Sequence, residues 1–463
     1  MYKRMIYSWA MLILCLPALL ATSPVYAASK QKAGQKKTSY QSKASRKPQA
    51  KKPAPARQVI RKPGSTRASV NFSKFHKHSA QKRKGYQPAP LPKITFSETL
   101  EMVSPDILHQ KGIQLPGLPA FSSVRNGMMA ATSPGEDTLY FTLDPSLQAY
   151  AQALSKSSRL NHISMVVMEP QTGKILAMAG SSSSLTDVLR HPGFPAASLF
   201  KLVTTTAALE KGAINPSSSI DFRGGNYTLN QYNYKPSPKA DTRHMNVSEA
   251  LGKSCNPVFA RLALNYLSTD TISRYTQAFG FNAPLPFDTS LPVSSANIPT
   301  DEYGLGRTAA GFGDVYLSPI HAAAMMAGIA NQGLMPRPYF VDHVTSSTGQ
   351  MIYQARPQAV RRLMRTDTAN TLMKMMISTT TTGTSRRAFA AGGHMGLSDM
   401  AVEGKTGTLD GTNPPGLNNW FIAAAPVGNP RVAVAVNVVN PAGVPKQASR
   451  LGRQLIEKFF HRI

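Results

Sequence analysis

Ser198 and Lys201 are spaced so that a hydroxyl and an amine meet on one face of a helix. The residues from Ser198 to Glu210 are predicted to be helical, and residues three apart on a helix lie about 5–6 Å apart at Cβ. A serine is a weak nucleophile until a base takes its proton. A lysine can be that base when burial and a second cation lower its pKa. The helix N-terminus adds free N–H groups for a developing oxyanion.

The same spacing also occurs on surface helices with an incidental lysine. Here Leu199 and Phe200 lie between the pair, and Leu202 follows it, so the helix is predicted to be largely buried. Lysine is almost never fully buried unless it has a partner or a task. A lysine in such a helix therefore needs a reason, and service as a base for Ser198 is one.

A second polar motif, Ser254 to Asn256, is predicted to form a loop between two helices, with Cys255 at its centre. Side chains in such a loop can project into a cleft. The alternative is a helix cap, because serine and asparagine are favoured at that position. Cys255 is expected to be a small buried thiol rather than a reactive one.

A third motif lies on a predicted strand and contains an amine, two hydroxyls and a glycine: Lys405, Thr406, Gly407 and Thr408. The glycine would let a substrate backbone approach closely. The amine and the hydroxyls would bind a carboxylate, and the charge of Lys405 would lower the pKa of Lys201. An ordinary edge strand that carries a lysine is the alternative.

The elements that must position these motifs follow from hydrophobic patterning and from turn residues. Helices are predicted at Thr142–Leu154, Ser198–Glu210, Val258–Leu267, Thr271–Phe279, Pro319–Asn331, Thr368–Ser378 and Lys446–Phe460. Strands are predicted at Ile163–Glu169, Ile175–Ala179, Met400–Glu403, Trp420–Ala425 and Val432–Val439. Strands near both ends with helices between them predict one sheet closed by both ends of the chain, in an α/β or α+β layered domain.

Charge is distributed unevenly over the 463 residues. The formal net charge is +29, and the first 97 residues contain 21 Lys or Arg and no Asp or Glu. Residues 28–95 are rich in Lys, Pro, Ala, Ser and Gln, so we expect a disordered basic linker. It would act as a solvated spacer or attach to anionic lipid or wall polymer. A nucleic-acid partner is not expected, because the chain is predicted to be exported.

The export prediction rests on residues 1–27. Lys3 and Arg4 precede a largely apolar run from Met5 to Thr22, and small residues around Ala27 suit a signal peptidase. An uncleaved membrane anchor is the alternative, since the run is close to the shortest length that spans a bilayer. The domains are predicted as residues 1–27 for the signal peptide or anchor, 28–95 for the basic linker, 96–136 for a transitional segment and 137–463 for the enzyme.

Cysteine content is low. Cys15 lies within the apolar run, so no disulfide with Cys255 is expected in the folded domain. No Cys/His cluster has the spacing of a zinc site.

Taken together and in this order, Ser-x-x-Lys, Ser-x-Asn and Lys-Thr-Gly are the motifs shared by penicillin-binding proteins and serine β-lactamases. Residues 137 to 460 resemble the transpeptidase domain of penicillin-binding proteins. Further matching stretches are residues 142–148, 169–178 and 208–212, Ser318 and Pro319 before a helix that ends at 330–333, and Trp420 with Phe421. The resemblance implies an antiparallel sheet flanked by helices, with an all-helical subdomain.

The resemblance also implies the residue roles and the reaction. It implies catalytic roles for Ser198, Lys201 and Ser254 and substrate contacts for Asn256, Lys405, Thr406, Gly407 and Thr408. The N–H groups of Ser198 and Thr408 would form the oxyanion hole. A D-Ala-D-Ala stem peptide of peptidoglycan would acylate the serine, and a neighbouring amine would then form a cross-link. β-Lactams would be covalent inhibitors, and no metal or organic cofactor is implied.

Other activities in this superfamily stay open. A D,D-carboxypeptidase would use the same residues. A class A β-lactamase needs a Glu after the second motif, yet no acidic residue follows Asn256 before Asp270. A class D enzyme typically has Val in place of Asn256. Slow hydrolysis of the acyl-enzyme is therefore expected. A non-catalytic β-lactam sensor or wall-binding scaffold is the alternative of another class.

The sequence departs from the family pattern in three places. No glycosyltransferase domain or N-terminal pedestal precedes the predicted enzyme domain. In the family a Gly-Gln-Gly element often precedes the Ser-Pro helix, whereas this chain has Gly311, Phe312 and Gly313 there, followed by Asp314. The loss of the glutamine is expected to alter local packing or binding.

Overall fold

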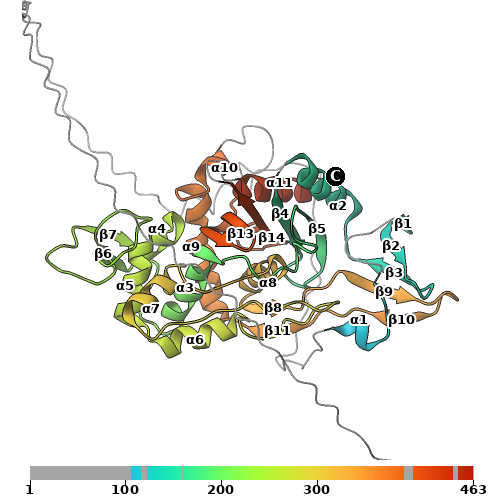
Figure 1. Ribbon diagram of the computed structural model, residues 1–463, viewed down its shortest axis with the longest axis horizontal. Coiled ribbons are helices and arrows are strands. Elements are labelled where there is room, and N and C mark those ends of the chain that lie inside the picture. Colours follow the sequence, from blue (N-terminus) through green and yellow to red (C-terminus); the bar gives the residue numbers. More distant parts are fainter. Residues whose placement is uncertain (1–105, 116–122, 159, 391–399, 442–446, 462–463) are drawn as a thin grey trace, which may run out of the picture. The chain divides into compact units, whose positions relative to one another are not determined.

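The computed structural model describes residues 106–115, 123–158, 160–390, 400–441 and 447–461 (Figure 1). All of them belong to one compact unit. The predicted targeting segment, the basic linker and the first part of the transitional segment lie outside the described residues.

A five-stranded antiparallel sheet forms the centre of the fold, in the order β12-β13-β14-β4-β5. β4 (His162–Met168) and β5 (Ile175–Ser182) form a hairpin, and β4 pairs with β14 (Val432–Asn440). β14 pairs with β13 (Pro415–Ala425), which pairs with β12 (Glu403–Thr412). Early and late strands share one sheet, which confirms the predicted architecture.

Helices cover both faces of this sheet. α2 (Pro145–Ser157) and α11 (Ala448–His461) lie on one face and α8 (Pro319–Ala330) on the other (Figure 1). Side chains of β14 alternate between the faces: Val434 and its i+2 neighbours join one hydrophobic cluster, and Ala433 joins the other. β14 is therefore buried throughout, which explains its nearly continuous apolar sequence.

Most of the other helices form the all-helical part, which meets β12 through α9 and the 3₁₀ helix. These other helices are the 3₁₀ helix Ala197–Phe200, α3 (Lys201–Glu210), α4 (Val247–Lys253), α5 (Asn256–Tyr266), α6 (Thr269–Ala278), α7 (Glu302–Ala309), α9 (Thr366–Thr381) and α10 (Arg386–Ala390). The mixed α/β fold with an antiparallel sheet agrees with the fold class expected from the sequence.

Other strands form a second five-stranded sheet, in the order β1-β2-β3-β9-β10, and two small pairs. Their bounds are β1 Ser123–Arg125, β2 Met128–Thr132, β3 Thr138–Phe141, β9 Val341–Thr345, β10 Met351–Gln354, β8 Leu334–Pro336, β11 Ala359–Arg362, β6 Ser219–Phe222 and β7 Arg243–Asn246. α1 (Ile107–Gln110), β1 and β2 fall within the transitional segment, for which the sequence predicted no element.

Two predicted strands were wrong in their bounds. The strand predicted at Met400–Glu403 begins only at Glu403 and continues to Thr412, and β13 begins at Pro415 rather than Trp420. The two form a hairpin paired over its whole length. Its outer part is polar and rich in glycine, so hydrophobic patterning missed it. Among the described residues, no helix has the length and apolar character to cross a membrane.

Candidate active site

The predicted nucleophile and base lie in hydrogen-bond contact. Lys201 Nζ is 2.8 Å from Ser198 Oγ. The serine lies in the 3₁₀ helix, and Lys201 is the first residue of α3. Ala197, directly before the serine, has a φ of +51°, which is unusual for a residue other than glycine. The turn into the helix is therefore tight at the position of the nucleophile.

The surroundings of Lys201 favour a neutral amine. Its side chain is fully buried, and its Nζ also lies 2.8 Å from Asn256 Oδ1 and against the Ala310 carbonyl oxygen. Burial lowers the pKa of Lys201 well below its ordinary value, and the nearby charge of Lys405 lowers it further. The Asn256 and Ala310 oxygens can only accept, so they take the two N–H groups of a neutral amine. Its lone pair is left for the Ser198 proton.

Asn256 is oriented by a backbone carbonyl. Its Nδ2 donates to the Tyr227 carbonyl oxygen at 2.7 Å. Because that oxygen can only accept, it fixes which end of the amide carries the NH₂ group and turns Oδ1 towards Lys201. The Asn256 backbone N–H donates to the Asn226 carbonyl oxygen, also at 2.7 Å. Asn256 is thus fixed at both its backbone and its side chain.

Ser254 belongs to the two-residue connection between α4 and α5, as the sequence predicted for this motif. It ends α4 in a left-handed conformation with φ of +55°. Cys255 follows and is fully buried, which raises the pKa of its thiol. The connection brings Ser254 Oγ to Lys405 on β12 and Asn256 to Lys201 on α3.

Lys405 lies opposite this connection. It is fully buried, and its Nζ donates to Ser254 Oγ at 2.9 Å and to the Thr406 carbonyl oxygen at 2.8 Å. No carboxylate of the described residues pairs with it. Burial lowers the pKa of Lys405 to about 7. A substrate carboxylate would supply the missing counter-charge.

The rest of the third motif continues along β12. Thr406 Oγ1 lies 2.6 Å from Thr384 Oγ1, and Thr408 Oγ1 accepts from Asn419 Nδ2 at 3.4 Å. A Cβ placed on Gly407 would lie 3.2 Å from the Ala196 carbonyl oxygen. The strand therefore packs directly against the turn that carries the nucleophile. Ser198, Lys201 and Asn256 form one hydrogen-bonded group, and Ser254 and Lys405 form a second. The other three predicted residues, Thr406, Gly407 and Thr408, follow Lys405 on β12.

The segment after α7 was noted in the sequence only as a departure from the Gly-Gln-Gly pattern, and none of its residues was assigned to the site. This segment includes Ala310, whose carbonyl oxygen contacts Lys201. It also includes Gly311, which packs against the turn that carries the nucleophile. A Cβ on Gly311 would lie 2.5 Å from the Ala197 carbonyl oxygen and 2.8 Å from the Ser198 nitrogen. Its φ is +93°, which favours glycine. The glycines around Phe312 were the sequence signal. Thr384 and Tyr227 gave none.

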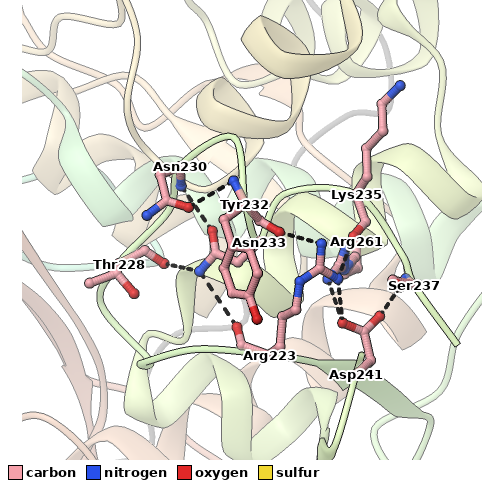
Figure 2. Close-up of polar contacts among 9 residues, drawn as sticks. All are labelled: Arg223, Thr228, Asn230, Tyr232, Asn233, Lys235, Ser237, Asp241 and Arg261. Atoms are coloured by element: carbon pink, nitrogen blue, oxygen red, sulfur yellow. Dashed lines mark hydrogen bonds and ion pairs between the residues drawn. The ribbon is translucent and has the colours of Figure 1, made fainter. Parts of the chain in front are cut away.

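The loop between β6 and β7 (residues 223–242) supplies the carbonyls that hold Asn256. Figure 2 shows how Asp241 closes it: one carboxylate oxygen accepts from Arg223 at 2.7 Å and from Arg261 at 2.9 Å, and the other from the Ser237 N–H at 2.7 Å. Burial alone raises the pKa of Asp241, but the Ser237 hydrogen bond and the two guanidinium groups hold it below its usual value. Since Arg261 lies on α5, the contact ties the loop to the helix that begins at Asn256.

Comparison with known proteins identifies the family. The family model described as the penicillin-binding protein transpeptidase domain matches residues 163–459. Because the match covers more than half of the chain and the site has the geometry described above, the chain belongs to the penicillin-binding transpeptidase family.

Curated relatives include two mycobacterial proteins, both named peptidoglycan D,D-transpeptidase PbpA. The one from Mycolicibacterium smegmatis is 31% identical over 314 residues, which cover 59% of this chain and 61% of the relative. The one from Mycobacterium tuberculosis is 31% identical over 335 residues, which cover 63% of this chain and 66% of the relative. The chain thus spans slightly less than two thirds of the length of these relatives.

Solved structures agree with the fold. The crystal structure of PBPA from Mycobacterium tuberculosis is 28% identical, with a TM-score of 0.57, and the alignment covers 69% of this chain and 81% of that one. The imipenem acyl-enzyme complex of penicillin-binding protein A from the same organism is also 28% identical, with a TM-score of 0.57 and coverage of 70% and 79%.

Proposed function

We propose that this chain is an exported, penicillin-binding peptidoglycan D,D-transpeptidase with Ser198 as its nucleophile. The observation that carries the proposal is the 2.8 Å contact between Ser198 Oγ and the buried Lys201 amine, whose pKa is lowered. The names of the mycobacterial relatives and the imipenem acyl-enzyme support it.

In the proposed acylation, Ser198 Oγ attacks the carbonyl carbon between the two D-alanines of a stem peptide, and Lys201 takes the hydroxyl proton. The N–H groups of Ser198 and Thr408 stabilise the oxyanion. When the C–N bond breaks, the proton passes from Lys201 through Ser254 to the leaving D-alanine nitrogen. An amine of a second stem peptide then attacks the ester, restores Ser198 and forms the cross-link.

Substrate contacts are proposed on both walls of the site. Asn256 holds the amide of the acyl donor. Lys405, Thr406 and Thr408 bind the terminal carboxylate. The missing Cβ of Gly407 lets the strand pack against the turn that carries Ser198. A β-lactam carboxylate takes the same place and leaves a stable ester on Ser198.

The test is mass spectrometry of the protein after treatment with penicillin. The wild type is expected to gain the mass of one penicilloyl group, on the peptide that contains Ser198, and to keep it for many minutes. Ser198→Ala is expected to gain none. Rapid turnover of penicillin without a stable adduct would instead favour a β-lactamase. No label on folded wild-type protein would favour a non-catalytic wall-binding protein.

A D,D-carboxypeptidase is the second candidate, because water can replace the acceptor amine at the same acyl-enzyme. Chromatography of muropeptides separates the two reactions. A transpeptidase yields cross-linked dimers, whereas a carboxypeptidase yields only shortened monomers.

The N-terminal assignments are part of the proposal. Residues 1–27 act as a signal peptide or membrane anchor, and residues 137–463 form the enzyme domain after the transitional segment 96–136. The enzyme would then work in the periplasm or on the outer face of the cell membrane. The 19 positive charges of residues 28–95 favour contact with anionic lipid or wall polymer.

A further inference from the structure

The guanidinium of Arg307, on α7, lies over two aromatic rings. Its central carbon is 5.5 Å from the ring centroid of Tyr303 and 5.4 Å from that of Phe312. The Tyr303 ring also has an edge contact with Tyr234 of the β6–β7 loop, with centroids 4.9 Å apart. The rings hold the cation in one place and leave its side chain partly exposed.

The guanidinium N–H groups of Arg307 have no hydrogen-bond partner among the described residues, so they can bind a ligand. Within the described part of the chain, no side-chain or backbone oxygen accepts a hydrogen bond from its guanidinium, and no carboxylate pairs with it. The neighbouring acids are engaged elsewhere: Glu302 pairs with Lys235 at 2.5 Å, and Asp301 accepts from the Gly304 N–H at 2.8 Å. A guanidinium held by its faces still presents N–H groups at its edge, in the fork that suits a carboxylate.

The backbone segment that follows Arg307 contacts the reacting groups. Ala310, one helical turn after Arg307, provides the carbonyl against Lys201. The Phe312 N–H donates to the Arg307 carbonyl oxygen at 2.8 Å, and Gly311 between them abuts the Ser198 nitrogen. One short backbone segment therefore carries both the carbonyl that binds the base and the ring that holds the cation.

Phe312 stands where the family often has glutamine, in the Gly-x-Gly element. A glutamine there would offer an amide, whereas Phe312 offers a ring face to Arg307. The phenylalanine in place of glutamine and the arginine that lies over its ring thus form one contact. It replaces a neutral polar group by a positioned positive charge.

We propose that Arg307 binds a carboxylate of the peptidoglycan peptide, distinct from the terminal carboxylate assigned to Lys405. The ligand is an acidic residue upstream of the D-Ala-D-Ala bond in the donor, or the corresponding residue of the acceptor. An extended peptide covers about 3.3–3.6 Å per residue, so the two to four residues upstream of the scissile bond extend about 7–14 Å from it. This inference rests on the proposed function for the identity of the peptide.

Binding is measured by calorimetry on the full chain, with two peptides that differ only in a carboxylate or a carboxamide at the upstream residue. In the donor arm, a stem pentapeptide is titrated into Ser198→Ala protein. In the acceptor arm, a tetrapeptide is titrated into wild-type protein already acylated by penicillin. We expect the carboxamide to bind about 10- to 100-fold more weakly in one arm, as for loss of a charged hydrogen bond.

Introducing Arg307→Gln into each arm is expected to remove this preference and leave the two peptides equal. Arg274→Gln is the matched control, because Arg274 also stacks on a tyrosine, Tyr275, at 5.2 Å on α6. It should keep the full preference. The proposal is overturned if neither arm distinguishes the peptides, or if Arg307→Gln weakens both peptides equally.

Release of D-alanine by wild-type protein tests the proposed function separately. If the carboxylate preference depends on Arg307 but no D-alanine is released, the carboxylate site stands and the transpeptidase proposal fails. If D-alanine is released and neither binding arm shows a preference, the reverse holds.

Discussion

Lys405 Nζ on β12 donates a hydrogen bond to Ser254 Oγ at the end of α4, over 2.9 Å, although 151 residues separate the two in the chain. The contact joins the sheet to the helical part of the molecule. It also links the second predicted motif, which contains Ser254, to the third, which contains Lys405. Each of the two serine hydroxyls thus has a lysine amine as a hydrogen-bond partner. The protonation state of the site therefore depends on these two buried lysines, whose pKa values are lowered.

Lys201→Met is expected to slow acylation by penicillin about 100- to 10,000-fold, because the change removes the base but keeps an unbranched side chain in the buried position. Acylation is followed with a fluorescent penicillin in a stopped-flow instrument. Lys211→Met, at the exposed end of α3, is the control and should acylate like the wild type. A Lys201→Met protein that is folded and acylates within tenfold of the wild type would remove the lysine from the mechanism.

The rate constant for acylation is expected to fall as pH rises above about 7. Free Lys405 loses its proton through that range, since burial lowers its pKa to about 7, and a neutral amine attracts the penicillin carboxylate less. The profile is measured between pH 6 and pH 9 under conditions where binding limits the rate. A rate constant that stays level or rises across this range contradicts the assigned role of Lys405.

Gly311→Ala is expected to damage the site by steric contact. The added Cβ would lie 2.5 Å from the Ala197 carbonyl oxygen, so the turn that carries Ser198 must shift, and shifts of about 1 Å can cost about 100-fold in rate. Gly349→Ala is the matched control: Gly349 also has positive φ, +85°, but a Cβ there has no neighbour within 4 Å. Both changes should cost about 1–2 kcal/mol of backbone strain, and only Gly311→Ala should slow acylation.

Asp241→Asn is expected to loosen the β6–β7 loop and with it the orientation of Asn256. Loss of the charge leaves Arg223 and Arg261 without their shared carboxylate, at a cost of about 1–3 kcal/mol in unfolding free energy. Urea unfolding measures this cost, and the acylation rate at fixed pH measures the effect on Asn256. Asp221→Asn, at an exposed position of β6, serves as control. Loss of stability with an unchanged acylation rate would mean that the loop does not position Asn256.

Glu403→Gln is expected to make stability less dependent on pH. Burial raises the pKa of Glu403 to about 8, so the folded state holds a proton that the unfolded chain releases above about 4.3. The stabilising contribution of this proton is complete below the unfolded pKa and is lost as pH rises towards 8. Relative to Glu403→Gln, wild type should therefore lose about 3–4 kcal/mol of unfolding free energy between pH 5 and pH 8. An equal difference in urea unfolding at both pH values would contradict this.

The sequence predicted best what depends on neighbours along the chain. The contact between Ser198 and Lys201 follows from helical spacing, and the sheet built from both ends follows from the apolar runs of β4 and β14. The convergence of Ser254 and Lys405 was reached only through the family resemblance, since nothing local specifies a contact across 151 residues.

Backbone groups explain most of what was missed. The carbonyls of Tyr227 and Ala310 hold Asn256 and Lys201, but any residue type supplies a carbonyl, so their sequence carries no signal. Gly311 was noted in the sequence only as part of the Gly-x-Gly element, and the structure explains the glycine by its φ of +93°. The outer half of β12 was missed because its residues are mostly polar or glycine and are only partly buried.

The order of strands in the central sheet has a consequence for how the enzyme comes into being. A chain that emerges from the ribosome, or from an export channel, N-terminus first presents Ser198 and Lys201 about 200 residues before Lys405. The hairpin of β4 and β5 pairs with the rest of the sheet only through β14, which comes late in the chain. β12 pairs with the sheet only through β13. A partly made or truncated chain that stops short of β12 therefore carries the nucleophile without the second amine. We therefore expect a nascent chain to form no acyl-enzyme until β12 and the strands after it have been made and have folded.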